Sequence, residues 1–324
     1  MSIMDFLVNN QWDAPFFKIL ARNDTAQATG HQAGMVIPKD LRHYFPTLDE
    51  KATSQLAPTV DRHLRAELYY ASIYKSDQII RYQFQTWGGT RSAESRLTDG
   101  LRPIREYAEE GDIMLFQRDA EILDHFRIVL VKKGTPEFAE ISDKVIGRRW
   151  GPLDEANPPI DQSRLEKAHA EIVEITQHPF EISKSEIKRF GSEVNLIARS
   201  SVFRELVQAE YSRKCAVSNI GILSPDFQYE VESAHIIPLS EGGTDDIRNG
   251  FALTRTLHWA FDRGLFGVLP NRTIYIPRQV KKIQENNYLK QFEKKLINEA
   301  KNKNLRVHPD AFYWHFNNRV RQWN

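Results

Sequence analysis

The chain has 324 residues, of which 41% are hydrophobic and 27% are charged, with a formal net charge of +1. That length can build two domains, and the absence of any run of eighteen apolar residues excludes a membrane-spanning helix. Residues 1–10 lack the basic start and apolar core of a secretory signal, and the single cysteine, Cys215, excludes an intramolecular disulfide. We therefore expect a cytoplasmic protein that does not associate with membranes.

The first 150 residues carry short β-type runs separated by long polar loops. Six apolar or aromatic runs bounded by turn residues predict strands at 16–20, 35–37, 68–73, 79–84, 113–116 and 126–131. Helical segments are expected at 39–45 and 136–146. Several short strands with interspersed helices predict a mixed barrel or pseudobarrel.

Two polar loops in this half are long enough to be functional. Residues 22–32 (RNDTAQATGHQ) precede one predicted strand, and residues 85–99 (QTWGGTRSAESRLTD) follow another. Their Arg, Asn and Gln side chains can read base edges in a DNA major groove, where Arg suits guanine and Asn or Gln suits adenine. Polar surface loops are also common without such a role, so the loops alone leave both interpretations open.

Residues 18–48 (KILARNDTAQATGHQAGMVIPKDLRHYFPTL) resemble the start of the N-terminal effector domain of the EcoRII restriction endonuclease, with the shared skeleton NDT, ATG, HQ, G, IP and FP. The likeness continues through residues 90–98 (TRSAESRLT) and covers residues 1–150. That family domain is a pseudobarrel similar to the plant B-three DNA-binding domain, and it grips duplex DNA between two arms.

The resemblance implies that residues 22–32 and 87–98 are the two arms. The DNA-binding residues that it implies are Arg22, Asn23, Gln32, Arg91 and Arg96. Between the two arginines of the second arm the chain reads SAES, where the family member has additional charged residues. This departure bears on the recognition sequence more than on DNA binding itself.

A change in composition marks the end of the first domain. Residues 150–159 (WGPLDEANPP) carry three prolines and a glycine without periodic apolar residues, which predicts a linker. Helical periodicity follows at 160–177 and again at 200–211. The expected organisation is a recognition domain at 1–150, a linker with helices at 151–198 and a second domain at 199–324.

Residues 233–266 (SAHIIPLSEGGTDDIRNGFALTRTLHWAFDRGLF) concentrate four side chains with metal or proton chemistry: His235, Asn249, His258 and Asp262. The glycine-rich stretch 239–245 predicts a loop, and apolar residues at helical spacing from Asn249 onward predict a helix. On that helix His258 and Asp262 are four residues apart, so they project from one face, where an imidazole and a carboxylate can hold a divalent cation. Taken singly, each residue has a plainer explanation in packing or turn formation; together they indicate metal-dependent phosphodiester hydrolysis.

This segment resembles the HNH endonucleases, whose small strand-strand-helix metal fold carries a His, an Asn and a second His in this order. The resemblance implies that His235 is the general base that deprotonates the attacking water and that Asn249 braces the loop which orients it. It also implies that His258 binds the metal, with Asp262 as a further ligand. The family metal is usually Mg²⁺, for which Mn²⁺ can substitute, and it neutralises charge on the phosphate and the leaving 3′ oxygen.

The sequence departs from the family at the position before the general base. Many members place a metal-binding Asp or His there, whereas this chain has Ala234. The metal therefore rests on His258 and Asp262 with water and phosphate, or Glu232 approaches it as well. Many relatives also carry a zinc knuckle made of CxxC pairs, which a chain with only Cys215 cannot form.

Positive charge is concentrated at the end of the chain. Residues 270–324 hold twelve Lys or Arg and four Asp or Glu, a local net of +8, so residues 1–269 carry −7. This segment is a candidate phosphate-binding surface. The alternative is a solvated amphipathic helix over residues 287–303.

Together these features predict an α+β protein in which a DNA-binding β pseudobarrel and a ββα-metal (HNH) nuclease domain are joined by a helical linker. The expected function is that of a type II restriction endonuclease that cuts double-stranded DNA with Mg²⁺ and leaves 5′-phosphates. Because one such site cuts one strand, a homodimer on DNA is expected. Two alternatives remain open: a nuclease that depends on modified DNA, and a DNA-binding regulator with an inactive HNH domain.

Overall fold

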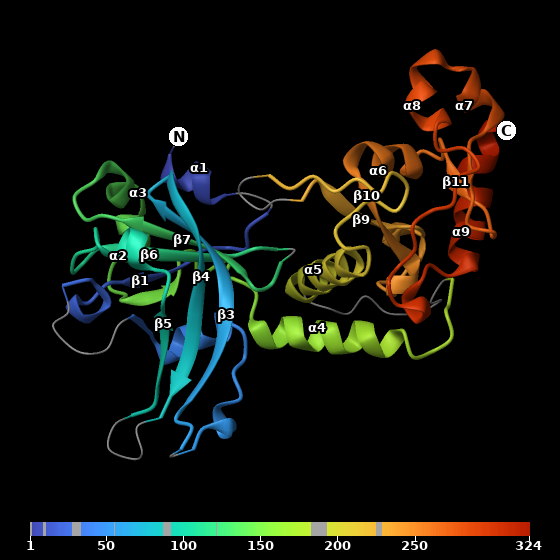
Figure 1. Ribbon diagram of the computed structural model, residues 1–324. Coiled ribbons are helices and arrows are strands. Elements are labelled where there is room, and N and C mark those ends of the chain that lie inside the picture. Colours follow the sequence, from blue (N-terminus) through green and yellow to red (C-terminus); the bar gives the residue numbers. More distant parts are fainter. Residues whose placement is uncertain are drawn as a thin grey trace. The chain divides into compact units, whose positions relative to one another are not determined.

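The computed structural model describes residues 2–8, 11–27, 34–54, 56–86, 92–120, 122–182, 193–224 and 229–324. The chain divides into two compact units, Met1–Arg164 and Leu165–Asn324 (Figure 1). Each unit combines helices and strands, which confirms the predicted α+β class. In the described part of the chain, no helix has the length and apolarity needed to cross a membrane.

The first unit is built on one eight-stranded sheet with the order β2-β5-β4-β3-β7-β6-β1-β8. All neighbours are antiparallel except β3 and β7, which run parallel. The strands are β1 (Phe16–Ile19), β2 (Met35–Ile37), β3 (Thr59–Tyr70), β4 (Ile73–Gln85), β5 (Glu94–Thr98), β6 (Ile113–Arg118), β7 (His125–Val131) and β8 (Trp150–Pro152).

Both faces of this sheet are covered. Successive side chains of a strand point to opposite faces, and in β6 Met114 and Phe116 enter one apolar cluster while Ile113 and Leu115 enter another. The helices α1 (Ile3–Leu7) and α3 (Pro136–Val145) cover the second cluster (Figure 1). The short helix α2 (Arg102–Arg105) contributes Ile104 to the first. Burial on both faces explains why β6 and β7 are near-continuous apolar runs in the sequence.

Two sequence predictions in this unit need correction. The strand expected at 68–73 crosses a turn, because β3 ends at Tyr70 and β4 begins at Ile73, with Ala71 between them at φ 48°. The hairpin is longer than expected because its outer ends are exposed and polar, so they lack an apolar pattern. The Pro-rich segment expected as a linker also begins inside the sheet, since β8 pairs with β1.

A buried polar cluster lies in the first unit around His125, which is 1% exposed. Its Nδ1 lies 3.1 Å from Asp119 Oδ2, and its Nε2 lies 3.3 Å from Glu67 Oε1. Burial alone would lower the pKa of this imidazole, but the two carboxylates outweigh burial and raise it to about 9. His125 is therefore charged in the folded protein at neutral pH.

The stability of the first unit should fall as the pH rises through about 9. The folded protein holds a proton on His125 that the unfolded chain, with an ordinary histidine pKa of about 6.5, loses at lower pH. The contribution is complete below about pH 6.5 and amounts to about 3 kcal/mol. Hydrogen exchange of the β6 and β7 amides at pH 6 and above 9 measures it. The pH dependence should shrink in His125→Gln and persist in the exposed-site control His63→Gln; equal pH dependence in both variants would contradict it.

The second unit contains a two-stranded sheet of β9 (Val231–His235) and β10 (Gly250–Thr254), followed directly by α6 (Arg255–Asp262). The helix α4 (Gln162–Ile175) begins at the end of the first unit, and α5 (Glu193–Glu210) packs on β9 and β10. The remaining elements are β11 (Gly267–Val268), β12 (Ile274–Tyr275), α7 (Arg278–Lys282), α8 (Asn287–Lys290), α9 (Pro309–His315), a π-helical turn at Phe316–Val320 and a 3-10 turn at Arg321–Trp323.

Two helix predictions in this unit are wrong in extent. The helix expected from Asn249 onward begins at Arg255, because the preceding residues pair with β9 as strand β10. The helix expected at 287–303 stops at Lys290. Lys294 then adopts φ 63°, and Leu296 forms a β-bridge with Thr273. Backbone pairing with the chain next to β12 therefore overrides the helical periodicity.

Candidate active site

The hairpin and α6 bring three candidate residues together. His235 ends β9 opposite Gly250 in β10, and α6 starts immediately after that strand. A Cβ at Gly250 would lie 2.5 Å from Phe203 Cζ. The absence of that Cβ lets the Phe203 ring stack on the imidazole of His235, with ring centroids 3.8 Å apart and planes 8° apart. His235 is thus held against a rigid aromatic wall.

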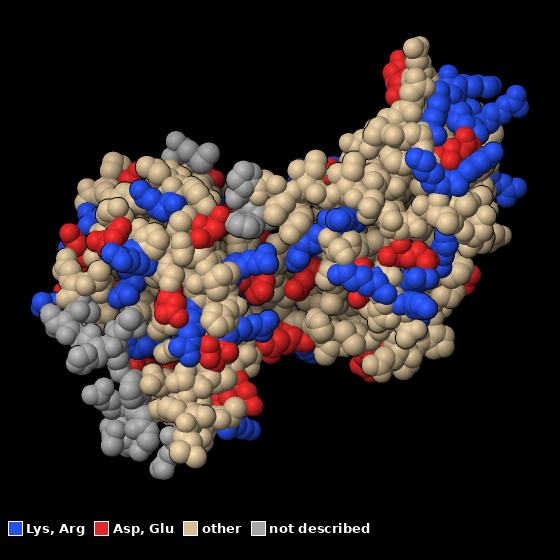
Figure 2. Space-filling model, in the orientation of Figure 1, with Lys and Arg blue, Asp and Glu red and all other residues tan. Residues whose placement is uncertain are grey.

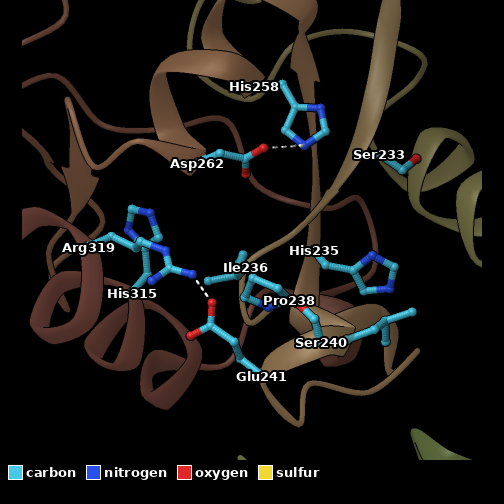
Figure 3. A pocket seen from close by; sticks show the side chains of 11 residues that line it. Ser233, His235, Ile236, Pro238, Ser240, Glu241, His258, Asp262, His315 and Arg319 are labelled. Carbon is cyan, nitrogen blue, oxygen red and sulfur yellow. Dashed lines mark hydrogen bonds and ion pairs between the residues drawn. The ribbon is translucent and has the colours of Figure 1, made fainter.

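His235, His258 and Asp262 line one pocket of about 520 Å³ (Figure 3). His258 and Asp262 lie on the same face of α6, as their four-residue spacing predicts, and His258 Nε2 is 3.6 Å from Asp262 Oδ2. The other polar residues of the lining are Ser233, Ser240, Glu241, His315 and Arg319. The pocket therefore brings together the two imidazoles and the carboxylate expected from the sequence, and adds the imidazole of His315 and the carboxylate of Glu241.

Glu232 orients His258 from outside this pocket. Its Oε2 lies 2.8 Å from His258 Nδ1, which leaves Nε2 facing Asp262. Burial alone would lower the pKa of His258, but the hydrogen bond with Glu232 and the charge of Asp262 raise it. The same hydrogen bond lowers the pKa of Glu232. A carboxylate on the far nitrogen of a ligating histidine is a common device that sets the tautomer and strengthens the ligand.

The donor set at this place fits a divalent cation. An imidazole nitrogen and a carboxylate oxygen that face each other are ligands accepted by Mg²⁺ or Mn²⁺. Partial burial raises the pKa of Asp262, although half of its side chain remains exposed. Within the described ranges no group of three or more His, Cys, Asp or Glu side chains is arranged to hold a metal. A cation bound by His258 and Asp262 would therefore take its other ligands from water and substrate.

The structure adds Asp245, which sequence reasoning missed as a functional residue. Its Oδ1 lies 3.1 Å from His235 Nε2, and its Oδ2 accepts a hydrogen bond of 3.1 Å from Arg199 Nε. Burial alone would raise the pKa of Asp245, but the bond with His235 and the charge of Arg199 lower it. An ionised Asp245 therefore holds Nε2 as the protonated nitrogen of His235 and leaves Nδ1 to accept a proton. In the sequence nothing distinguishes it from Asp246, which instead caps the turn at Ile247–Asn249.

Asn249 holds the loop between the two strands. Its side chain is fully buried. The Oδ1 atom accepts from Ile237 N at 3.0 Å, while Nδ2 donates to Ile237 O at 3.0 Å and Thr244 O at 2.9 Å. These bonds tie Ile237, two residues after β9, to Thr244, the residue before Asp245. Asn249 therefore fixes the two chain segments that carry His235 and its carboxylate partner.

The residues expected to read DNA lie in the first unit. Arg22 and Asn23 are exposed in a 3-10 turn at Arg22–Asp24. Arg96 lies in β5, is 8% exposed and pairs with Glu94 at 2.8 Å. Gln32 and Arg91 fall outside the described residues. Of the three candidate DNA-binding residues that the structure describes, Arg22 and Asn23 thus present their side chains to solvent, whereas Arg96 is buried.

Comparisons with known proteins identify the domain that contains the pocket. Residues 215–269 match the family model described as HNH endonuclease, and this span includes His235, Asn249, His258 and Asp262. A solved structure titled "Modification dependent TagI restriction endonuclease" is similar with a TM-score of 0.33 and 10% identity, over 96% of this chain and 97% of that chain. No curated protein matches significantly. The chain therefore contains an HNH endonuclease domain.

Proposed function

We propose that this protein is a metal-dependent restriction endonuclease that hydrolyses double-stranded DNA. The observation that carries the proposal is the convergence of His235, His258 and Asp262 on one pocket inside the residues that match the HNH endonuclease family. This is the arrangement that one-metal phosphodiester hydrolysis requires: a base for the water and a cation for the phosphate.

The residues divide the chemistry between them. His258 and Asp262 would hold Mg²⁺ or Mn²⁺, which supplies charge neutralisation at the phosphate and at the leaving 3′ oxygen. His235 takes the proton of the attacking water at Nδ1, and Asp245 stabilises the resulting imidazolium through Nε2. The water oxygen forms the new bond to phosphorus as the bond to the 3′ oxygen breaks. The leaving 3′ oxygen takes a proton from solvent water, so the products are a 5′-phosphate and a 3′-hydroxyl.

Sequence recognition is assigned to the first unit. The resemblance of residues 18–48 to the EcoRII effector domain supports a pseudobarrel with two DNA-binding arms, and the exposed Arg22 and Asn23 on the first arm support base reading. On the second arm, Arg96 would have to break its ion pair with Glu94 in order to contact DNA. Two protomers acting on one site, each cutting one strand, would produce a double-strand break. The expected compartment is the cytoplasm.

A basic surface of the second unit supports backbone binding. Lys and Arg side chains gather over the region of α7 and α8 (Figure 2). Arg278 and Lys282 line a hollow of about 690 Å³ there together with Trp323. Positively charged side chains of this kind bind backbone phosphates without reading the base sequence. They therefore add affinity for DNA that decreases as the salt concentration rises.

Digestion of genome-scale DNA with Mg²⁺ or Mn²⁺, followed by sequencing of the fragment ends, tests the proposal. Cleavage at a recurring sequence is the expected result, and the ends report site and stagger together. Matched methylated and unmethylated plasmids distinguish the two kinds of restriction enzyme, because a modification-dependent nuclease cuts only the methylated one. Absence of cleavage on all these DNAs would instead favour a DNA-binding regulator with an inactive HNH domain, for which Ala234 is the motivating departure.

Asp245→Asn should slow cleavage by about 10²- to 10⁴-fold, because an amide can donate to Nε2 and favour the wrong tautomer of the base. Single-turnover rates measure the effect. The neighbouring change Asp246→Asn weakens the ion pair of Asp246 with Arg248 and serves as the control for local structure. A rate for Asp245→Asn equal to that of Asp246→Asn would remove the orienting role of Asp245.

A further inference from the structure

One positively charged side chain lines the active-site pocket, and it lies outside the residues of the HNH match. Among the described residues that line the pocket, Arg319 is the sole Lys or Arg. It comes from the π-helical turn at Phe316–Val320, 50 residues beyond the last matched position. Figure 3 shows its side chain reaching into the pocket beside His315 and meeting Glu241. A phosphodiester entering the pocket would encounter this guanidinium.

The segment that carries Arg319 is anchored to α6. His315 Nε2 bonds the carbonyl oxygen of Phe261 at 2.8 Å, and the two rings stack with centroids 3.6 Å apart. Phe261 directly precedes the metal-ligand candidate Asp262. The C-terminal segment is thus held at the turn of α6 that bears the metal site.

Two glycines allow an especially close approach at this contact. Gly264 has φ +67°, and a Cβ there would clash with the carbonyl oxygen of Arg319. A Cβ at Gly267 would lie 2.8 Å from Val320 Cγ2, and Val320 is fully buried. The backbone at 319–320 therefore packs against the domain where a larger residue would push it away. The contacts of His315 before Arg319 and of Val320 after it therefore fix the backbone of Arg319 at the pocket.

The guanidinium of Arg319 is held but accessible. Its Nη2 forms an ion pair with Glu241 Oε1, and the group lies 5.6 Å from the centroid of the Trp314 ring. The two ion-paired side chains are 29% and 38% exposed, so solvent reaches them. Exposed ion pairs of this type are worth little. The scissile phosphodiester offers two non-bridging oxygens for a bidentate pair and gains negative charge as the water attacks, so it can displace Glu241 from Arg319.

We propose that Arg319 binds the scissile phosphate and stabilises the charge that builds up on it, and that Glu241 holds the guanidinium in place until DNA enters. This inference rests on the proposed nuclease function. It gives the C-terminal segment a direct part in the reaction. Among the described pocket residues, His258 and Asp262 are the pair that faces each other as cation ligands, and Ala234 stands where many relatives have a further ligand. A second positive group beside the phosphate therefore meets a specific electrostatic need.

The test compares Arg319→Ala and Arg319→Lys with the control Arg321→Ala, which removes an exposed arginine two residues further on. Single-turnover cleavage of the DNA cut by the wild type and Mn²⁺ affinity by titration are measured for each variant, together with thermal unfolding. Arg319→Ala should cut about 10²- to 10³-fold more slowly with unchanged Mn²⁺ affinity, whereas Arg319→Lys should keep part of the wild-type rate. Added guanidinium should partly restore cleavage by Arg319→Ala and should not speed up the other proteins. The variant Arg321→Ala should match the wild type.

A second variant tests the part played by Glu241. Glu241→Gln frees the guanidinium, so the KM for DNA should fall while Mn²⁺ affinity stays the same. Two outcomes would overturn the role of Arg319. In the first, Arg319→Ala cuts DNA at the same rate as Arg321→Ala. In the second, Arg319→Ala loses Mn²⁺ affinity or fold stability in proportion to its loss of rate, and added guanidinium restores no cleavage. In either case the proposed function survives as long as the wild type cuts DNA and His235→Ala does not. A wild type that cuts no DNA overturns the proposed function and this inference with it.

Discussion

His235→Ala should abolish metal-dependent cleavage while leaving DNA binding nearly intact. Asp245 engages Nε2 of His235 and leaves Nδ1 to take the proton of the water, and alanine places no proton acceptor at that position. Loss of a general base costs about 10²- to 10⁴-fold in rate, and loss of the Phe203 stacking partner also loosens the pocket wall. Single-turnover cleavage and gel-shift binding measure the two properties separately.

The exposed His169, in α4 of the same unit, provides a matched control, since His169→Ala changes neither the pocket nor a buried contact. Thermal unfolding of His235→Ala should remain close to that of the wild type because this side chain is partly exposed. Retention of more than a tenth of the wild-type rate in His235→Ala would show that another group activates the water. Parallel loss of DNA binding and cleavage would show that the substitution disturbs the fold.

Asn249→Ala should destabilise the second unit by about 3 to 5 kcal/mol. The substitution removes one acceptor and two donors, and it leaves the amide and carbonyl of Ile237 and the carbonyl of Thr244 without those partners. Each buried polar group left unsatisfied costs about 1 to 3 kcal/mol. Urea unfolding measures the loss, and hydrogen exchange of the β9 and β10 amides places it in this hairpin.

Cleavage by Asn249→Ala should be lost together with stability, because the same bonds position the chain on both sides of the loop that joins His235 to Asp245. The control is Asn304→Ala, which changes an exposed asparagine in the same unit. An Asn249→Ala protein of normal stability that cuts slowly would assign the amide a direct contact with substrate. Normal stability with normal cleavage would remove any bracing role.

Local pattern was sufficient for the features that depend on neighbours in the sequence. The four-residue spacing of His258 and Asp262 placed both on one face of α6, and the apolar runs at 113–116 and 126–131 marked two strands of the sheet. The order of His, Asn and His identified the HNH domain that the family comparison confirms. These features were predictable because helix and strand periodicities are properties of consecutive residues.

Local pattern failed where partners far along the chain determine the structure. Residues 287–303 have helical periodicity, but Leu296 forms a β-bridge with Thr273 instead of continuing the helix. The sequence of the segment does not show that this partner is available. In the same way, the sequence left open whether Glu232 binds the metal, and the structure places it on the far nitrogen of His258. The contact that places Glu232 behind the imidazole is with His258, 26 residues further along the chain.

The α+β class and the HNH domain could thus be read from the sequence alone, which also led us to propose His235 as the base and His258 and Asp262 as the metal-binding pair. The groups around them depend on long-range packing: Asp245 lies behind His235, Glu232 lies behind His258, and Arg319 at the pocket is 78 residues along the chain from its ion-pair partner Glu241. The physical reason is that a motif records the spacing of groups on one element. The hydrogen bonds and charges that tune those groups come from wherever packing brings other elements against it.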